Sequence, residues 1–237
     1  MRLYFTKIGF FAFHPACLIN TIFAGMNKRI FITGTGTGVG KTVTAACVTE
    51  ALQADYWKPV QTGLAEGTDT HTIQSLISNH ITACHPEVYA LDAPESPHLA
   101  ARLQQQTIDT DLIMARLREF DPARPLVIEG AGGLMVPINE EVFTLEMISR
   151  MEARVIIAAQ NYLGSINHAM LTARVLQHTG VPVIGWIFGG DWHSNEEDII
   201  RWSGIPRIGR IPRASTVGKA FIQEQAQLLS PSLHQLL

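Results

Sequence analysis

Cysteine is scarce in this chain of 237 residues. Cys17, Cys47 and Cys84 are widely separated, odd in number and form no C-x-x-C pair. This pattern is a poor basis for a disulfide framework or a cysteine-rich metal site. It fits a reducing compartment, and we therefore expect a cytoplasmic protein.

Charge is also scarce, since charged residues make up 16% of the chain and the net charge is −3. General nucleic-acid binding needs a cationic surface, so nucleic acid is not expected as a partner. Apolar residues make up 46%, a fraction that supports a full core and argues against a disordered or fibrous chain. The chain contains no internal repeat, low-complexity tract or linker, and one domain is predicted.

A long uninterrupted hydrophobic run is missing as well. Residues 1–25 are rich in Phe and Ile, but His14, Pro15 and Asn20 interrupt the apolar stretch. It fits poorly as a secretory signal, and a membrane span needs roughly 20 mostly apolar residues. We favour a translation start at Met26, because residues 26–32 are typical of a domain's first strand. Residues 1–25 are thus predicted to be a non-native or mis-assigned leader, and residues 26–237 are predicted to form the domain. This domain should fold and act without the leader, and we expect no membrane association.

Short apolar runs alternate with longer helix-like segments, a pattern typical of a parallel sheet with crossover helices. Most runs are continuously apolar, as strands covered on both faces must be. The sequence thus predicts an α/β domain with a mostly parallel sheet and helices on both faces. Residues 83–96, with three acids and two prolines, are predicted to be a surface loop. The predicted strands are 29–33, 55–60, 126–129, 155–159, 183–188 and 208–211, and the predicted helices are 42–52, 69–78, 97–104, 109–119, 145–150, 166–177 and 195–202.

The segment GTGTGVGKT at 34–42 lies between a predicted strand and a predicted helix. Its glycines let successive backbone N–H groups point at phosphate oxygens, and the helix N-terminus adds a favourable dipole. Lys41 can reach the β and γ phosphates while the Thr42 hydroxyl binds Mg²⁺. Five residues, rather than the usual four, separate Gly34 from Gly40. We predict a P-loop NTPase-like domain whose nucleotide contacts include Gly38, Val39, Gly40, Lys41, Thr42 and Val43.

Two further strand ends carry charged side chains. The run LVIE ends at Glu129, which would place a carboxylate beside the metal at the carboxyl edge of the sheet. The glycine-rich residues Gly130, Ala131 and Gly132 follow and are predicted to approach the phosphates. Lys58, one of only five lysines, ends another apolar run and precedes Pro59. We interpret it as a functional lysine, with an exposed strand-end lysine as the alternative.

From Met26 to about Ser215 the chain resembles the dethiobiotin synthetases, ATP-dependent enzymes of biotin synthesis. The five-residue gap in the phosphate loop is this family's own form. The segments that carry the resemblance occur in the family's order: GTxTxVGKT from Gly34, KPV from Lys58, EGAGG from Glu129 and GSINHAMLT from Gly164.

The resemblance implies a ligase that uses 7,8-diaminononanoate, CO2 or bicarbonate, and ATP, with Mg²⁺ as cofactor. One substrate amine takes up CO2 as a carbamate, whose oxygen attacks the γ-phosphate. The other amine closes the resulting carbamic-phosphoric anhydride into a cyclic urea, releasing phosphate. Because an anion approaches an anion, cations are needed at the site.

By the same resemblance Lys41 and Lys58 neutralise the developing charge and are the catalytic residues. Thr37 would face the carbamate and Thr62 would contact the substrate. The implied metal ligands are Thr42, Asp69 and Glu129. For Asp69, the nearby Glu66 is an alternative ligand, and an N-cap role is an alternative function.

The resemblance also implies a homodimer with its substrate site at the subunit interface. Residues Leu163, Gly164, Ser165, Ile166 and Asn167 open a helix whose free N–H groups suit a carboxylate. In the family this element comes from the neighbouring subunit and binds the substrate's carboxylate tail. A bare helix start is the alternative.

The base-binding region departs from the family. Gly189, followed by Gly190, stands where the family commonly has an Asn that reads adenine. Base recognition is then left to backbone groups or to the Pro212, Arg213 and Ala214 loop. The hypothesis is relaxed selectivity, which a tenfold or larger preference for ATP over GTP and CTP would refute.

A partitioning-ATPase type of P-loop switch is the main rival. Those proteins usually carry a second lysine early in the phosphate loop, and residues 35–39 contain none. They also often end in a basic amphipathic helix, whereas no Lys or Arg follows Ala220. A related ligase acting on another diamine or acid is the nearer alternative.

Overall fold

A seven-stranded parallel sheet forms the centre of the computed structural model, which describes residues 28–191 and 195–237. Its strand order is β4-β2-β6-β1-β7-β8-β9, and every neighbouring pair is parallel. The predicted leader and the start at Met26 lie outside the described residues. The strands are β1 Arg29–Gly34, β2 Asp55–Trp57, β4 Cys84–His85, β6 Leu126–Gly133, β7 Arg154–Gln160, β8 Val183–Gly189 and β9 Arg207–Ile211, and a second sheet pairs β3 Val60–Thr62 with β5 Tyr89–Leu91.

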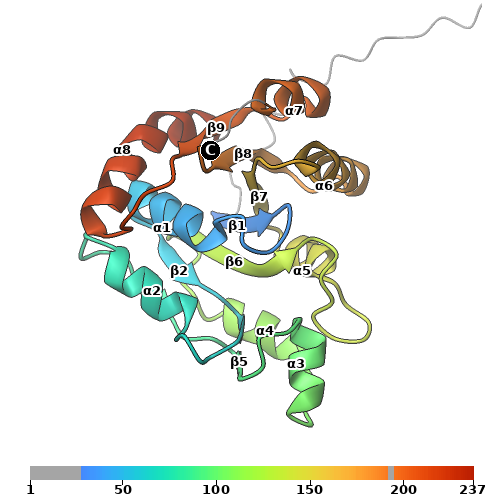
Figure 1. Cartoon of the computed structure of the whole chain (residues 1–237). Coiled ribbons are helices and arrows are strands. Elements are labelled where there is room, and N and C mark those ends of the chain that lie inside the picture. Colours follow the sequence, from blue (N-terminus) through green and yellow to red (C-terminus); the bar gives the residue numbers. More distant parts are fainter. Residues whose placement is uncertain (1–27, 192–194) are drawn as a thin grey trace, which may run out of the picture.

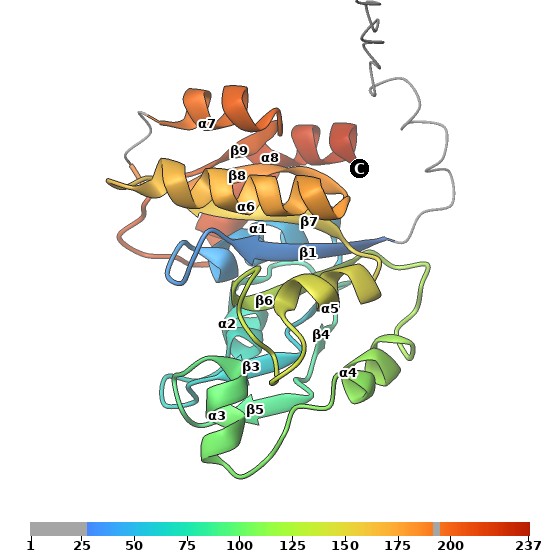
Figure 2. The same ribbon diagram turned by 90° about the vertical axis from the view of Figure 1, so that its right-hand side faces the viewer.

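Helices cover both faces of this sheet (Figures 1 and 2). On one side lie α1 Lys41–Leu52, α2 Asp69–Leu76 and α8 Lys219–Leu236. The others are α3 Pro97–Leu103, α4 Thr110–Leu117, α5 Thr144–Arg150, α6 Ser165–Thr179 and α7 Glu196–Ser203. No helix in the described ranges is long and apolar enough to cross a membrane.

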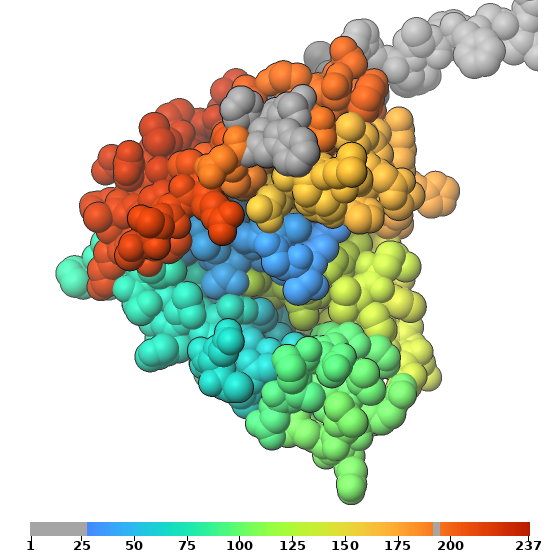
Figure 3. All heavy atoms as spheres, in the orientation of Figure 1, coloured from blue at the N-terminus to red at the C-terminus, as the bar shows by residue number. Residues whose placement is uncertain are grey.

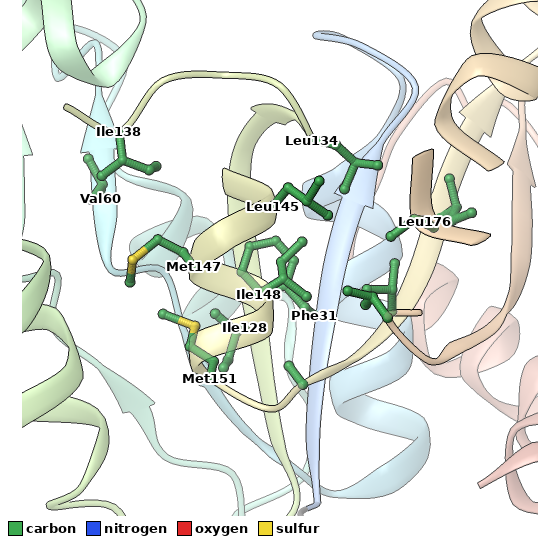
Figure 4. Close-up of a cluster of buried hydrophobic side chains, with 14 of the residues drawn as sticks. Phe31, Val60, Ile128, Leu134, Ile138, Leu145, Met147, Ile148, Met151 and Leu176 are labelled. Atoms are coloured by element: carbon green, nitrogen blue, oxygen red, sulfur yellow. The ribbon is translucent and has the colours of Figure 1, made fainter. Parts of the chain in front are cut away.

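Alternating side chains divide the core into two clusters, one for each face of the sheet. Successive residues of a strand point to opposite faces. Phe31 of β1 therefore belongs to one buried cluster, and its neighbours Ile30 and Ile32 belong to the other. Figure 4 shows the first cluster, in which Met147 and Ile148 of α5 lie beside the strands. The continuous apolar runs are explained by this burial on both faces.

The predicted α/β fold and its parallel sheet are confirmed, but the single strand at 55–60 is wrong. The chain leaves the main sheet after Trp57, and Val60 starts a strand of the second sheet. Pro59 lies at the break, and a proline has no backbone N–H to donate to a ladder. The interruption places Lys58 in the turn between the two strands.

The prediction that 83–96 is only a surface loop is also wrong. Cys84 and His85 pair with Tyr56 and Trp57 in the main sheet. Residues 89–91 pair with 60–62 in the second sheet. These strands have two and three residues, too few for a periodic pattern to be visible, and partners distant in the sequence define them.

The C-terminal helix α8 was not among the predicted elements. It packs on α1 and β9, and it buries Ile222, Leu229 and Leu233. Pro231 lies inside it, where it removes one backbone hydrogen bond. Because its apolar side is part of the core, this helix stabilises the β9 edge of the sheet.

Candidate functional site

The phosphate loop joins β1 to α1 at the carboxyl edge of the sheet. Gly38 and Gly40 have positive φ angles of 74° and 87°, which glycine adopts without a steric penalty. The Thr35 N–H donates to the Ala158 carbonyl oxygen at 3.1 Å. Lys41 donates from Nζ to the Gly36 carbonyl oxygen at 2.9 Å. The loop thus leads from a strand to a helix N-terminus through glycines with positive φ angles, the backbone arrangement that phosphate binding would use.

Thr42, Asp69 and Glu129 come together beside this loop although they are far apart in the sequence. The Thr42 Oγ1 lies 3.1 Å from Asp69 Oδ1 and 2.9 Å from Glu129 Oε1. Glu66 is exposed and does not line the cavity around these atoms. The N-cap of α2 is Thr68, whose hydroxyl accepts from the His71 N–H. Asp69 is therefore free of the N-cap role and is oriented toward Thr42.

Two residues that sequence reasoning missed hold these carboxylates in place. The Tyr56 hydroxyl donates to Glu129 Oε2 at 2.8 Å, and Tyr56 is fully buried. Gln61 Oε1 accepts from the Asp69 backbone N–H at 3.1 Å. The available signal for Tyr56 was the alternation of strand side chains, which puts it on the same face of the predicted strand 55–60 as Lys58.

Lys58 joins the same cluster. Its Nζ contacts Asp69 Oδ2 and lies 3.6 Å from Glu129 Oε1. The side chain is only 8% exposed, which excludes the alternative of an exposed strand-end lysine. A buried lysine beside two carboxylates is a localised positive charge at the cavity wall.

The electrostatics act differently on the two lysines, since the pKa of Lys41 is lowered and that of Lys58 is raised. Burial lowers the pKa of Lys41, while the carboxylates of Glu129 and Asp69 act in the opposite direction. Burial also acts to lower the pKa of Lys58, but Glu129 and Asp69 outweigh it and the pKa is raised. Burial, together with the charge of Glu129, raises the pKa of Tyr56. Tyr56 therefore remains a hydrogen-bond donor at neutral pH.

A catalytic-side cavity of about 600 Å³ contains these groups. Figure 3 shows the blue start of the described chain between the red and orange C-terminal segments and the cyan and green segments. Thr37 and Thr62 line the cavity, as do Ala131 and Gly132. Sequence reasoning missed its remaining wall, which includes Val136 and residues 94–97.

A second, base-side cavity of about 320 Å³ adjoins the first and shares Gly38, Gly40 and Val43 with it. Val39 lines it, as do the predicted base-site residues Gly189, Gly190, Pro212, Arg213 and Ala214. The wall also contains residues that sequence reasoning missed, which are Thr44, Gln160, Ile211, Val217 and Phe221. The phosphate loop thus separates two compartments.

Not every predicted site residue meets these cavities. Gly130 lines neither of them, and a Cβ there would lie 2.6 Å from the Phe31 ring, so it permits close packing of two strands. Residues 163–167 line neither cavity within this chain. They form the start of α6, with Gly164 as N-cap at φ 99° and Leu163 93% exposed.

The chemistry of the donor set fits Mg²⁺. Thr42, Asp69 and Glu129 offer a hydroxyl and two carboxylates, the hard oxygen ligands that this ion prefers. Among the described residues no group of three or more His, Cys, Asp or Glu side chains could hold a metal. A magnesium ion here would therefore share its coordination with phosphate oxygens and water.

A family model and known proteins match most of this chain. The family model described as an AAA domain matches residues 28–220. The ATP-dependent dethiobiotin synthetase BioD of Bradyrhizobium sp. (strain BTAi1) is 46% identical over 79% of this chain and 88% of its own length. The same enzyme of Agrobacterium fabrum (strain C58) is 44% identical over 79% and 87%. That of Christiangramia forsetii is 41% identical over 85% and 96%.

Solved structures share the fold at much lower identity. The MinC:MinD cell division protein complex of Aquifex aeolicus matches with a TM-score of 0.56 and 14% identity, over 88% of this chain and 95% of that one. The cell division ATPase MinD of Pyrococcus furiosus matches with a TM-score of 0.54 and 14% identity, over 89% and 100%. At this identity the likeness concerns the fold alone.

Proposed function

The chain belongs to the family of ATP-dependent dethiobiotin synthetases, and from that premise we propose which of its residues carry out the reaction. The activity is that of an ATP-dependent ligase of biotin synthesis. The observation that supports the residue assignment is the convergence of Lys41, Lys58, Thr42, Asp69 and Glu129 on one cavity beside the phosphate loop.

We assign the triphosphate of ATP to the phosphate loop, with its base in the base-side cavity. The N–H groups at 38–42 bind the phosphate oxygens, and Lys41 adds a positive charge next to them. Magnesium, when bound, supplies further positive charge beside the phosphates. Thr42, Asp69 and Glu129 would hold it, oriented by Tyr56 and Gln61.

The diamine, 7,8-diaminononanoate, would occupy the catalytic-side cavity. One amine adds to CO2 and loses a proton, giving a carbamate that Thr37 and Thr62 position. A carbamate oxygen attacks the γ-phosphorus as the bond to ADP breaks. The second amine then attacks the carbamate carbon, phosphate leaves, and a cyclic urea remains. Lys58 and Lys41 reduce the repulsion between the anions in these steps.

A homodimer would complete the substrate site, with residues 163–167 of one copy binding the substrate carboxylate of the other. A third cavity of about 360 Å³ lies between the phosphate loop and α6, and it shares Thr37 and Val136 with the catalytic-side cavity. Two exposed apolar side chains, Met135 and Leu171, line this cavity, and Leu163 is exposed just before α6. An exposed apolar patch of this kind supports an interface with a second copy. Light scattering of the purified protein should give the dimer mass, and a monomer at assay concentration would contradict this arrangement.

Turnover with defined substrates tests the function. Purified protein is mixed with ATP, Mg²⁺ and bicarbonate, with and without 7,8-diaminononanoate, and phosphate release is measured beside mass spectrometry of the product. We expect the diamine to stimulate phosphate release and to be converted into the cyclic urea. Absence of both effects would refute the proposed reaction, whereas activity only with another diamine would identify a related ligase.

A further inference from the structure

The base-side cavity contains one side-chain amide among its described lining residues. Its wall includes glycines at 38, 40, 189 and 190 and several apolar side chains, such as Val43 and Phe221. The polar side chains in this wall belong to Thr44, Gln160 and Arg213. Of these, Gln160 alone can both donate and accept through adjacent atoms of one group.

The nearby backbone groups are already engaged. The Gly190 N–H donates to the Ile211 carbonyl oxygen at 3.1 Å, and the Gly190 carbonyl oxygen accepts from the Arg210 guanidinium. The Arg213 N–H donates to Asp191 Oδ1 at 3.2 Å. Pro212 has no N–H. The N–H groups of Gly190 and Arg213 and the Gly190 carbonyl oxygen therefore already have partners within the protein.

The Gln160 side chain lies against Gly190. It ends β7 and pairs with Gly189 at the end of β8. A Cβ on Gly190 would lie 3.3 Å from Gln160 Nε2, so the amide lies directly against a residue that has no side chain. Within the described residues the Gln160 amide makes no hydrogen bond to another protein group. Its donor and its acceptor are both available to a ligand.

We propose that Gln160 is the specificity-determining residue for adenine in this enzyme. Its Oε1 accepts from the adenine N6 amino group and its Nε2 donates to adenine N7, the pairing that Gln and Asn make with this edge. Guanine presents two acceptors, O6 and N7, at the same edge, so a carboxamide leaves one of them unpaired. This inference rests on the proposed function only in taking the base-side cavity as the place of the ATP base.

The position of Gln160 changes the expected nucleotide selectivity, which was based on Gly189. The absence of an amide at 189 predicted relaxed selectivity on the assumption that backbone groups or the 212–214 loop read the base. The structure brings an amide from the neighbouring strand to the same cavity. Strict preference for ATP is then expected.

Direct nucleotide binding to the full chain, measured by calorimetry with Mg²⁺, tests the role of Gln160. The wild-type protein should bind ATP at least tenfold more tightly than GTP or CTP, because a bidentate contact discriminates by about tenfold or more. It should also bind 7-deaza-ATP, which lacks the N7 acceptor, about fivefold more weakly than ATP. In Gln160→Leu both ratios should fall to within about twofold of one.

The matched control is Gln227→Leu, an exposed glutamine of α8, which should keep both wild-type ratios. If Gln160→Leu fails to fold in a thermal unfolding assay, Gln160→Ala provides the same comparison. A wild-type preference below tenfold, or a 7-deaza effect that persists in the variants, overturns the role of Gln160. Because binding is measured without the diamine, failure of the ligase reaction in the turnover assay would contradict the proposed function and leave this result independent of it.

Discussion

At the scale of single residues, Glu129 defines the chemistry of the site. It is almost completely buried, at 1% exposure, and it faces the hydroxyls of Thr42 and Tyr56 as well as the ammonium of Lys58. A carboxylate in such a position is oriented by its hydrogen bonds rather than by its own flexibility. Tyr56, which lines neither the catalytic-side nor the base-side cavity, is therefore expected to affect the reaction without touching the substrate itself.

Replacement of Lys58 by Ala should reduce kcat about 100-fold, since it removes a preorganised charge from the transition state. ATP binding should change little, because the phosphate loop and Lys41 remain. Steady-state kinetics and calorimetric nucleotide binding measure the two effects. Lys219→Ala, at the exposed start of α8, is the control. Equal turnover in the Lys58 variant would remove this residue from the mechanism.

Tyr56→Phe should weaken Mg²⁺ affinity about tenfold, because a partner that orients a metal-binding carboxylate is lost. The shape of the side chain is kept, so the fold is expected to be maintained. Mg²⁺ affinity is measured by titration of the metal against the ATP complex. Tyr89→Phe removes a hydroxyl that accepts from the Asp109 N–H, away from the carboxylates, and should leave the Mg²⁺ titration unchanged. The same titration curve in both variants would exclude a positioning role for Tyr56.

At the scale of elements, α8 depends on close packing against the last strand. Leu229 is 1% exposed, and a Cβ on Gly209 of β9 would lie 2.2 Å from Leu229 Cδ2. Such a distance is far inside van der Waals contact. Residue 209 must therefore be a glycine because α8 packs so close to it. A special backbone conformation at 209 is not what requires the glycine.

Leu229→Ala should lower the free energy of unfolding by about 3 kcal/mol, the usual cost of deleting a buried leucine side chain. Gly209→Ala should also destabilise, because the added methyl group collides with Leu229. In the double variant the smaller residue at 229 makes room, so the cost should be less than the sum of the single costs. Urea unfolding of the wild type, the two single variants and the double variant measures this coupling. Strictly additive changes in the free energy of unfolding would show that the two residues are not in contact.

At the scale of the whole molecule, Asp55 forms hydrogen bonds to segments that are distant from it in the sequence. It begins β2 and accepts from the Arg124 Nε at 3.0 Å and from the Ala83 N–H at 3.0 Å. Burial acts to raise the pKa of Asp55, but the bonds to Arg124 and Ala83 outweigh it and the pKa is lowered. A carboxyl group whose pKa is lowered in the folded state stabilises the protein at pH values above the pKa that it has in the unfolded chain. This stabilisation is lost as the pH falls through the lowered folded-state pKa.

Asp55→Asn should therefore cost about 2 kcal/mol at pH 7, where hydrogen bonds to a charged group are lost. The difference from wild type should shrink as the pH falls below about 4 toward the lowered folded pKa. Thermal unfolding at pH 7, 5 and 3.5 measures it. A difference that stays constant across this range would mean that the charge of Asp55 does not contribute.

The success of the sequence predictions varied with the range of the interactions involved. The phosphate loop at 34–42 depends on residues adjacent in the sequence, and the structure has the predicted strand, loop and helix there. Likewise, a helix was predicted at 166–177, and α6 ends at the C-cap Gly180, whose positive φ angle of 71° suits glycine. The short strands at 84–85 and 89–91 depend on distant partners, and no local pattern revealed them.

The same distinction applies to the site. Lys41, Thr42, Lys58 and Glu129, which the structure brings to one cavity, could be proposed from the sequence because each is a charged or hydroxyl residue at the end of an apolar run or in a glycine-rich loop. Gln61 and Gln160 were missed because nothing in their local sequence distinguishes them from ordinary strand residues, and for Tyr56 the only local signal was its place two residues before Lys58 on the same predicted strand. Their importance comes from what the sheet order places opposite them.

The sequence by itself determined the fold class, the phosphate loop and the family, because these depend on local spacing and on residue types that few other structures require. Only the tertiary structure decided that Tyr56 orients Glu129, that Gly209 accommodates α8 and that Gln160 lies beside two glycines at the base-side cavity. The physical reason is the parallel sheet: its strands converge at one carboxyl edge, where side chains more than 100 residues apart in the sequence, such as Val43 and Gln160, come to line the same cavity.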